Sequence, residues 1–114
     1  MNSHLNSELL NELRELMEDD FSVLLETYLA ESQRQFAGAR GALENGDLEA
    51  LKRFAHSMKG SSSNIGAESL SGLCGKLESG AKHDERDVLT QLLADVEGEL
   101  GVVCDEVETM RTAL

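Results

Sequence analysis

The sequence has no proline, and aromatic residues make up only 4% of its 114 residues. β-Sheets are usually rich in aromatic and β-branched residues, so this shortage favours packed helices over a sheet. Hydrophobic residues still amount to 40%, which is enough for a globular chain with a buried core rather than a disordered one. We therefore expect a single all-α domain over residues 1–114.

Positive charge is also scarce, because 10 Lys and Arg face 22 Asp and Glu, for a formal net charge of −12. This balance argues against broad binding to nucleic acid or to an anionic membrane surface. No stretch approaches the roughly 20 apolar residues of a membrane span, and the N-terminus lacks a signal-peptide pattern. We therefore expect a cytoplasmic protein with neither nucleic acid nor membrane as a partner.

Residues that bind metals through sulfur or imidazole are few and scattered. The two cysteines, Cys74 and Cys104, both fall on apolar stripes, which predicts small reduced core side chains. A disulfide between them stays open, although two cysteines make no disulfide framework. The three histidines, His4, His56 and His83, show no paired-ligand spacing. We therefore expect no metal site and no intrinsic cofactor.

Apolar residues recur at helical spacing in five segments. A short N-terminal helix is expected over about residues 5–17, and four longer helices over about residues 19–112. Four amphipathic helices with short connections predict an antiparallel up-down four-helix bundle, with the additional short helix covering one end. The expected core positions are Leu5, Leu9, Leu13 and Leu16; Phe21, Leu25, Tyr28, Ser32, Phe36, Ala39 and Leu43; Leu48, Leu51, Ala55 and Met58; Leu70, Leu73, Cys74 and Leu77; and Val88, Leu92, Val96, Leu100, Val103, Val107 and Met110.

Turn signals separate these segments. In the NGD stretch, Gly46 suits a left-handed helix C-terminus and Asp47 suits the N-cap of the next helix. That third helix is expected to end near Ile65 and Gly66. The stretch KHDERD, residues 82–87, is expected to separate the fourth helix from the fifth.

In the third expected helix, His56 lies almost opposite the apolar side chains on a wheel drawn at roughly 100° per residue. The wheel therefore predicts that His56 faces solvent. Basic residues are concentrated around it in an otherwise acidic chain, because residues three and four apart share a helix face. The neighbours on this face, with one residue a turn further along, are Lys52, Arg53, Lys59, Gly60 and Ser63.

An ordinary surface histidine on a solvated charged face is one explanation of this cluster. The other is chemical, since a phosphoryl group on His56 would find cationic donors within one turn. A neutral imidazole is a competent nucleophile. No P-loop, glycine-rich nucleotide loop or acid–base triad accompanies it in the sequence. The pattern therefore predicts a nucleophile whose phosphoryl donor is activated by a partner, which describes a relay rather than an autonomous kinase.

At these residues the chain resembles the histidine-containing phosphotransfer (HPt) domain family, whose pattern is roughly A-H-x-x-K-G-S-S-x-x-x-G-A. The resemblance extends from about Phe21 to Met110 and includes LCGKLE, residues 73–78. It implies a four-helix bundle with an additional short N-terminal helix. No kinase or receiver domain accompanies the motif, so we expect a free-standing bacterial-type module. The matching positions are Ala55, His56, Lys59, Gly60, Ser61, Ser62, Gly66 and Ala67.

The resemblance also implies the chemistry. His56 would accept a phosphoryl group from the phospho-aspartate of a receiver domain in a hybrid sensor kinase. It would pass the group to the receiver aspartate of a response regulator, or back. Lys59 would stabilise the phosphoryl group, and we expect Lys52 to support it. Magnesium is expected on the partner receiver domain, and the chain itself is expected to be a monomer.

Further positions have expected roles around this histidine. The resemblance implies that Gly60 lets the receiver dock closely, and we expect Arg53 and Ser63 to contribute to the same docking surface. In some members a glutamine on the following helix orients the histidine, and Glu78 occupies the aligned position here. Ser61 and Ser62 lie toward the core side of the wheel, which predicts small residues for close helix packing.

Two alternatives stay open. Acyl carrier proteins are small acidic helical bundles with phosphopantetheine on the serine of a D-S-L motif, and Glu68, Ser69 and Leu70 resemble that motif. Ser69 would be the attachment site, but the basic residues around His56 would then have no explanation. The other alternative, a purely structural helical adaptor, predicts no covalent chemistry at His56.

Overall fold

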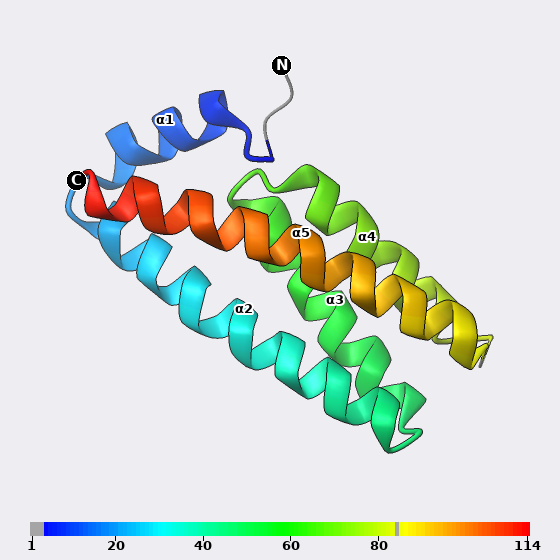
Figure 1. Cartoon of the computed structure of the whole chain (residues 1–114). Helices are drawn as coiled ribbons and strands as arrows, with labels where there is room; N and C mark the ends of the chain where they lie inside the picture. The colour runs from blue at the N-terminus through cyan, green and yellow to red at the C-terminus, as the bar shows by residue number, and fades with distance from the viewer. Residues whose placement is uncertain (1–3, 84) are drawn as a thin grey trace.

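A computed structural model of the chain describes residues 4–83 and 85–114, and the residues that it describes form five helices (Figure 1). The helices are α1 (Ser7–Met17), α2 (Asp20–Glu44), α3 (Leu48–Asn64), α4 (Glu68–Gly80) and α5 (Arg86–Thr112). The four longer helices run antiparallel, and each packs against two of the others. The prediction of an all-α four-helix bundle with an additional short N-terminal helix is therefore confirmed.

Helix α1 lies across the end of the bundle where α2 begins and α5 ends (Figure 1). It begins at Ser7, after Asn6, whose side chain accepts a hydrogen bond from the backbone N–H of Leu9 at 3.1 Å. The backbone N–H of Asn6 in turn donates to the carbonyl of Gly66 at 2.9 Å. The segment before α1 is thereby fixed to the turn between α3 and α4.

The turns around α3 form as the sequence predicts. Gly46 and Gly66 adopt positive φ angles of 72° and 78°, a conformation that glycine reaches without steric cost. Asp47 caps α3 by accepting a hydrogen bond from the backbone N–H of Ala50 at 3.1 Å. A side chain at Gly66 would also collide with Asn6, whose Cβ lies 2.6 Å from the position of an added Cβ. These two glycines therefore set the length and direction of the helix that carries His56.

The core contains the apolar stripes of α2, α3 and α4 largely as predicted. All seven predicted positions of α2 are buried, and so are Leu51, Ala55 and Met58 of α3. Both cysteines are free and buried, as predicted for reduced core residues. Burial raises the pKa of the Cys74 thiol to about 12, so this thiol stays protonated at neutral pH.

Among the predicted core positions, Leu16 and Val88 are exposed, and Leu9 is only partly buried. Leu16 is 81% exposed while Leu10 is buried, because α1 crosses the bundle end and only a narrow stripe of it touches the core. In α5, Val88 is 47% exposed and Leu89 is fully buried, since Leu89 packs against Gly80 where α4 turns into α5. The break predicted at residues 82–87 begins one residue earlier and ends two residues earlier, because α4 ends at Gly80 and α5 begins at Arg86; residue 84 lies outside the described residues.

Among residues 4–83 and 85–114, none of the helices is both long enough and apolar enough to span a membrane.

Candidate functional site

His56 projects from the solvent face of α3, opposite the buried side chains of Leu51, Ala55 and Met58. Its side chain is 68% exposed, as the helical wheel predicts. The core therefore holds the backbone of this helix while the imidazole stays open to an approaching protein. The arrangement suits a group that reacts with a partner rather than one that packs inside the fold.

Glu78 of α4 contacts both His56 and Lys59. Its Oε2 lies 2.9 Å from Nδ1 of His56, and its Oε1 lies 2.8 Å from Nζ of Lys59. The hydrogen bond from Lys59 is the main cause of the lowered pKa of the Glu78 carboxyl; partial burial opposes this shift, and the His56 contact supports it. A carboxylate only accepts hydrogen bonds, so Nδ1 of His56 donates, and in the neutral ring the lone pair is then on Nε2.

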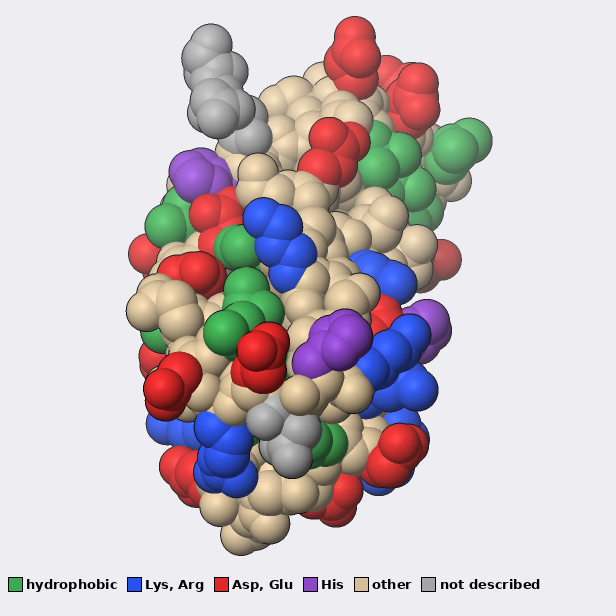
Figure 2. Space-filling model, turned by 90° about the vertical axis from the view of Figure 1, so that its right-hand side faces the viewer, with side chains coloured by type: hydrophobic (Ala, Val, Ile, Leu, Met, Phe, Trp, Pro, Cys, Tyr) green, Lys and Arg blue, Asp and Glu red, His purple; other side chains and the backbone are tan. Residues whose placement is uncertain are grey.

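A shallow hollow opens beside the imidazole and is lined by Lys52, Arg53, His56, Ser57 and Glu78. Neither Lys52 nor Arg53 forms an ion pair with another residue in the part of the chain that the structure describes. On the face drawn in Figure 2, Lys and Arg side chains lie beside two of the histidines, and acidic side chains are spread around them. The hollow thus offers unpaired positive charge next to a nucleophile.

Gly60 lies one turn after His56 and is exposed. A Cβ added there would meet nothing within 4 Å. The packing of the isolated chain therefore does not require glycine at this position. The missing side chain leaves open space beside His56, as the expected close approach of a receiver would need.

The three serines after Gly60 differ in position. Ser63 is exposed, on the side of the helix that carries His56. Ser62 is fully buried and shares a hydrogen bond of 3.0 Å with the hydroxyl of Tyr28, while Ser61 donates to the carbonyl of Met58 at 3.3 Å. The predicted packing role of Ser62 is thus accompanied by a polar contact between α2 and α3, which one sequence alone does not reveal.

Sequence reasoning missed two residues of α4 beside Lys59. Ser71 donates from Oγ to the carbonyl of Lys59 at 3.0 Å, and Gly75 lies under its side chain. A signal was present, since Ser71 and Gly75 precede Glu78 by seven and three residues and so share its helix face. Sequence reasoning also missed Ser57, which lines the hollow. Ser57 is adjacent to His56 in the sequence, and adjacent residues on a helix do not share a face.

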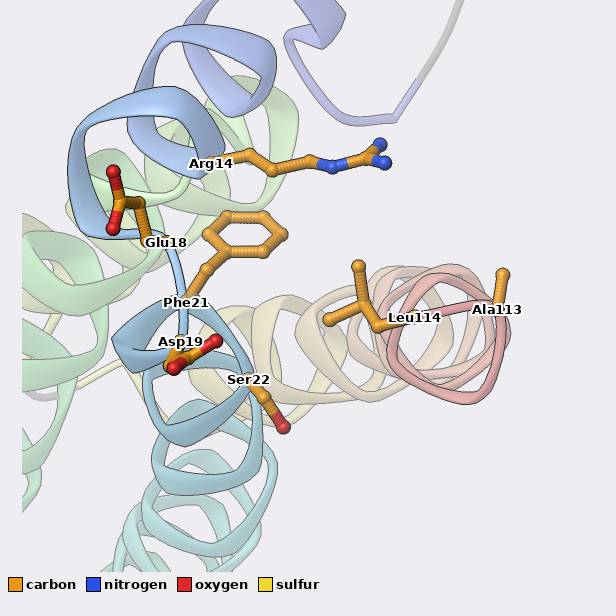
Figure 3. Close-up of a pocket in the computed structure, with 7 residues that line it drawn as sticks. All are labelled: Arg14, Glu18, Asp19, Phe21, Ser22, Ala113 and Leu114. Carbon is orange, nitrogen blue, oxygen red and sulfur yellow. The ribbon is translucent and has the colours of Figure 1, made fainter.

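A second hollow lies at the opposite end of the site's helices, between the start of α2 and the end of α5 (Figure 3). The side chain of Arg14 extends over the ring of Phe21 toward Leu114. None of the residues around His56 lines this hollow, and no group of His, Cys, Asp or Glu within residues 4–83 and 85–114 is arranged to hold a metal ion. We therefore place the candidate site at His56.

Comparison with known families matches residues 23–113 to the Hpt domain. Comparison with curated protein sequences found no match. Among solved structures, the chain is similar to histidine-containing phosphotransfer protein B (HptB) from Pseudomonas aeruginosa PAO1. The two are 36% identical, the TM-score is 0.94, and the alignment covers 100% of this chain and 99% of that one.

Two more distant structures share the fold. One is a putative histidine-containing phosphotransfer protein from rice, with 19% identity, a TM-score of 0.86 and coverage of 96% of this chain and 81% of that one. The other is the HPT domain of a sensor hybrid histidine kinase from Shewanella, with 20% identity, a TM-score of 0.80 and coverage of 97% and 96%. At these identities the likeness concerns the fold alone.

Proposed function

Because the chain belongs to the Hpt domain family, and is thus a histidine-containing phosphotransfer protein of a phosphorelay rather than a kinase, we propose that His56 carries the phosphoryl group. The observation that supports this most strongly is the contact of Nδ1 with Glu78 at 2.9 Å on an imidazole that is 68% exposed. It directs the Nε2 lone pair away from α4. His4 has no basic residue within four positions in the sequence, and the basic neighbours of His83, Lys82 and Arg86, are interspersed with acidic residues.

We propose a transfer step in which each bond formed is matched by a bond broken. The Nε2 lone pair attacks the phosphorus of a receiver phospho-aspartate, the N–P bond forms, and the O–P bond breaks with its electron pair returning to the aspartate carboxylate. The Nδ1 proton stays on the ring and in the hydrogen bond with Glu78, which we propose orients His56. Return transfer to a receiver reverses these bonds and releases neutral imidazole.

Lys59 is the residue that we propose stabilises the transferred phosphoryl group. Its ammonium is one turn from His56 and, at rest, pairs with Glu78 at 2.8 Å. Phosphoryl transfer depends on positioning and on charge stabilisation, so an ammonium held one turn from His56 serves both. Lys52, on the rim of the hollow, adds a second positive charge.

Membership of the family implies receiver domains as partners. We propose that they belong to hybrid sensor kinases and response regulators, and that they dock over Gly60, Arg53 and Ser63 while the chain remains a monomer. The reacting atoms must come within about 3 Å, and the bare surface at Gly60 permits that approach. Kinases of such relays consume ATP, so we place the exchange in the cytoplasm.

Magnesium is proposed to reside on the receiver, where it would neutralise the phospho-aspartate; no intrinsic cofactor is proposed for this chain. The direct test mixes the purified protein with each phosphorylated receiver domain of the source cell and follows labelled phosphate with time. We expect labelling of the parent protein, slower labelling of Lys52→Gln, no labelling of His56→Gln, and loss of transfer on chelation. Labelling of His56→Gln would overturn the assignment, and tight magnesium binding by the isolated chain would overturn the placement of the metal.

A further inference from the structure

A single face of α4 holds Lys59 from its backbone to its ammonium group. Ser71, Gly75 and Glu78 follow one another at spacings of four and three residues, so their positions form one stripe along this helix. Ser71 donates from Oγ to the Lys59 carbonyl at 3.0 Å, and Glu78 pairs with Lys59 Nζ at 2.8 Å. Gly75 lies between them, where an added Cβ would be 3.4 Å from Cδ of Lys59.

We propose that Ser71 and Gly75 are positioning residues for Lys59, with Ser71 fixing the backbone and Gly75 leaving the space in which the lysine side chain crosses α4. This proposal rests on the proposed role of Lys59 in phosphoryl transfer. Lys59 is long and flexible, and its side chain is 39% exposed. We call the surface of α4 formed by Ser71 and Gly75 the lysine seat. Without it, the Lys59 ammonium would be spread over many rotamers, so fewer molecules would present it beside His56.

The Lys59 side chain limits the free space over Gly75. A Cβ at 3.4 Å from Lys59 Cδ makes an ordinary van der Waals contact, so Gly75→Ala should be accommodated. The two γ carbons of valine occupy two of the three staggered positions, so Gly75→Val should displace the lysine side chain. Gly72 offers a matched control, because it lies in the same helix and an added Cβ there meets nothing within 4 Å.

The first readout does not need phosphotransfer. The hydrogen bond from Lys59 is the largest cause of the lowered pKa of the Glu78 carboxyl. Displacement of Lys59 should therefore raise the pKa of Glu78 toward its ordinary value, which a carbon-13 NMR titration of the Glu78 carboxyl measures. We expect this rise in Gly75→Val and in Lys59→Ala, and no rise in Gly72→Val. An unchanged pKa of Glu78 in Gly75→Val would overturn the proposal that Gly75 leaves space for the Lys59 side chain.

The second readout is transfer from a phosphorylated receiver. We expect Gly75→Val to slow transfer about tenfold, or about 1.4 kcal/mol, with Gly72→Val at the parental rate. Ser71→Ala should slow transfer by a smaller factor, about threefold, because it removes one neutral hydrogen bond. In a Lys59→Ala background, Gly75→Val should have no additional effect. An equal additional loss in that background would show that valine obstructs the receiver instead, and would overturn the proposal.

The two readouts separate the proposals from each other. If Lys59→Ala transfers at the parental rate, the proposed role of Lys59 fails, but a raised Glu78 pKa in Gly75→Val would still support the seat. If Lys59→Ala slows transfer while Gly75→Val changes neither the Glu78 pKa nor the transfer rate, the proposed positioning by Gly75 is wrong and the proposed role of Lys59 is supported. Should Gly75→Val fail to fold, Gly75→Leu places its branch one carbon further out and is tested in the same way.

Discussion

The two faces of α3 have different roles: one packs in the core, and the other faces solvent and a partner. The core face carries side chains that are almost completely buried, such as Leu51, Ala55 and Met58. The other face carries His56, Lys59 and Gly60, whose side chains or open surface are available to a partner. Residues on the first face should determine stability with little effect on transfer, and those on the second should determine transfer with little effect on stability.

The largest expected effect on the core face is that of Leu51→Ala. Leu51 is fully buried, so its truncation should lower the free energy of unfolding by about 2–5 kcal/mol. Urea unfolding followed by circular dichroism measures this change. Transfer by the folded fraction should stay near the parental rate, and a tenfold slower transfer at unchanged stability would contradict the division between the faces.

The corresponding change on the face that carries His56, which we call the reactive face, is Gly60→Gln. Because an added Cβ meets nothing within 4 Å, the variant should fold with parental or slightly higher stability. Its longer side chain should stand between His56 and the receiver, so we expect receiver affinity and transfer to fall at least about tenfold. Receiver titration, transfer kinetics and thermal melts on one preparation test this prediction. Transfer at the parental rate would refute the close-approach role, and unfolding would instead indicate a backbone requirement.

Lys59→Ala should have a comparable effect on transfer. A charge-assisted contact contributes about 1.5–3 kcal/mol, so transfer should slow by about tenfold to a hundredfold. The measurement is the single-turnover rate from a phosphorylated receiver, with Lys76→Ala as an exposed lysine control on α4. Equal rates for the two variants would remove Lys59 from the site.

Two glycines sharpen the comparison further. A Cβ at Gly38 would lie 2.5 Å from ring carbons of Phe54 on α3, whereas a Cβ at Gly60 would meet open space. We therefore expect Gly38→Ala to destabilise by about 1–3 kcal/mol through overpacking. Gly60→Ala should instead stabilise by up to about 1 kcal/mol through helix propensity. Thermal melts of both variants measure the difference, and a change of the same sign in both would be inconsistent with the comparison.

The smallest expected effect lies outside both faces, at the contact between His4 and Glu99. Nδ1 of His4 is 2.6 Å from Oε2 of Glu99, and this hydrogen bond is the main cause of the raised pKa of His4. A raised folded-state pKa stabilises the fold below the ordinary value of about 6.5, and the gain is lost as pH rises through the folded pKa. His4→Gln should therefore destabilise slightly at about pH 5.5 and not at about pH 9. Equal losses at both values, in urea unfolding, would rule out this linkage.

Much of the face that carries His56 could be predicted from one sequence, because the helical period alone places His56 opposite Leu51 and Met58. The contact of Glu78 with both His56 and Lys59 could be foreseen only as an orienting role implied by family resemblance. Its double geometry depends on how closely α3 and α4 pack. The seat formed by Ser71 and Gly75 depends on the same packing.

The core positions that were predicted wrongly have a related cause. Val88 and Leu89 are both apolar, so periodicity does not distinguish which of them faces inward; the turn that brings Gly80 against Leu89 does. Leu16 fits the helical period of α1, yet α1 crosses the bundle end instead of running along it. Local pattern predicts a helix and its apolar side, whereas the docking angle of that helix is decided by distant residues.

The most direct test of the central claim is to locate the phosphoryl group itself. After incubation with a phosphorylated receiver, intact mass and peptide mapping should show one phosphoryl group on the peptide that contains His56. The adduct should be labile in acid and stable in base, as expected for a phosphoramidate, and absent from His56→Gln with unchanged helical content. An acid-stable adduct, or a phosphoryl group on another residue such as Ser69, would contradict the account.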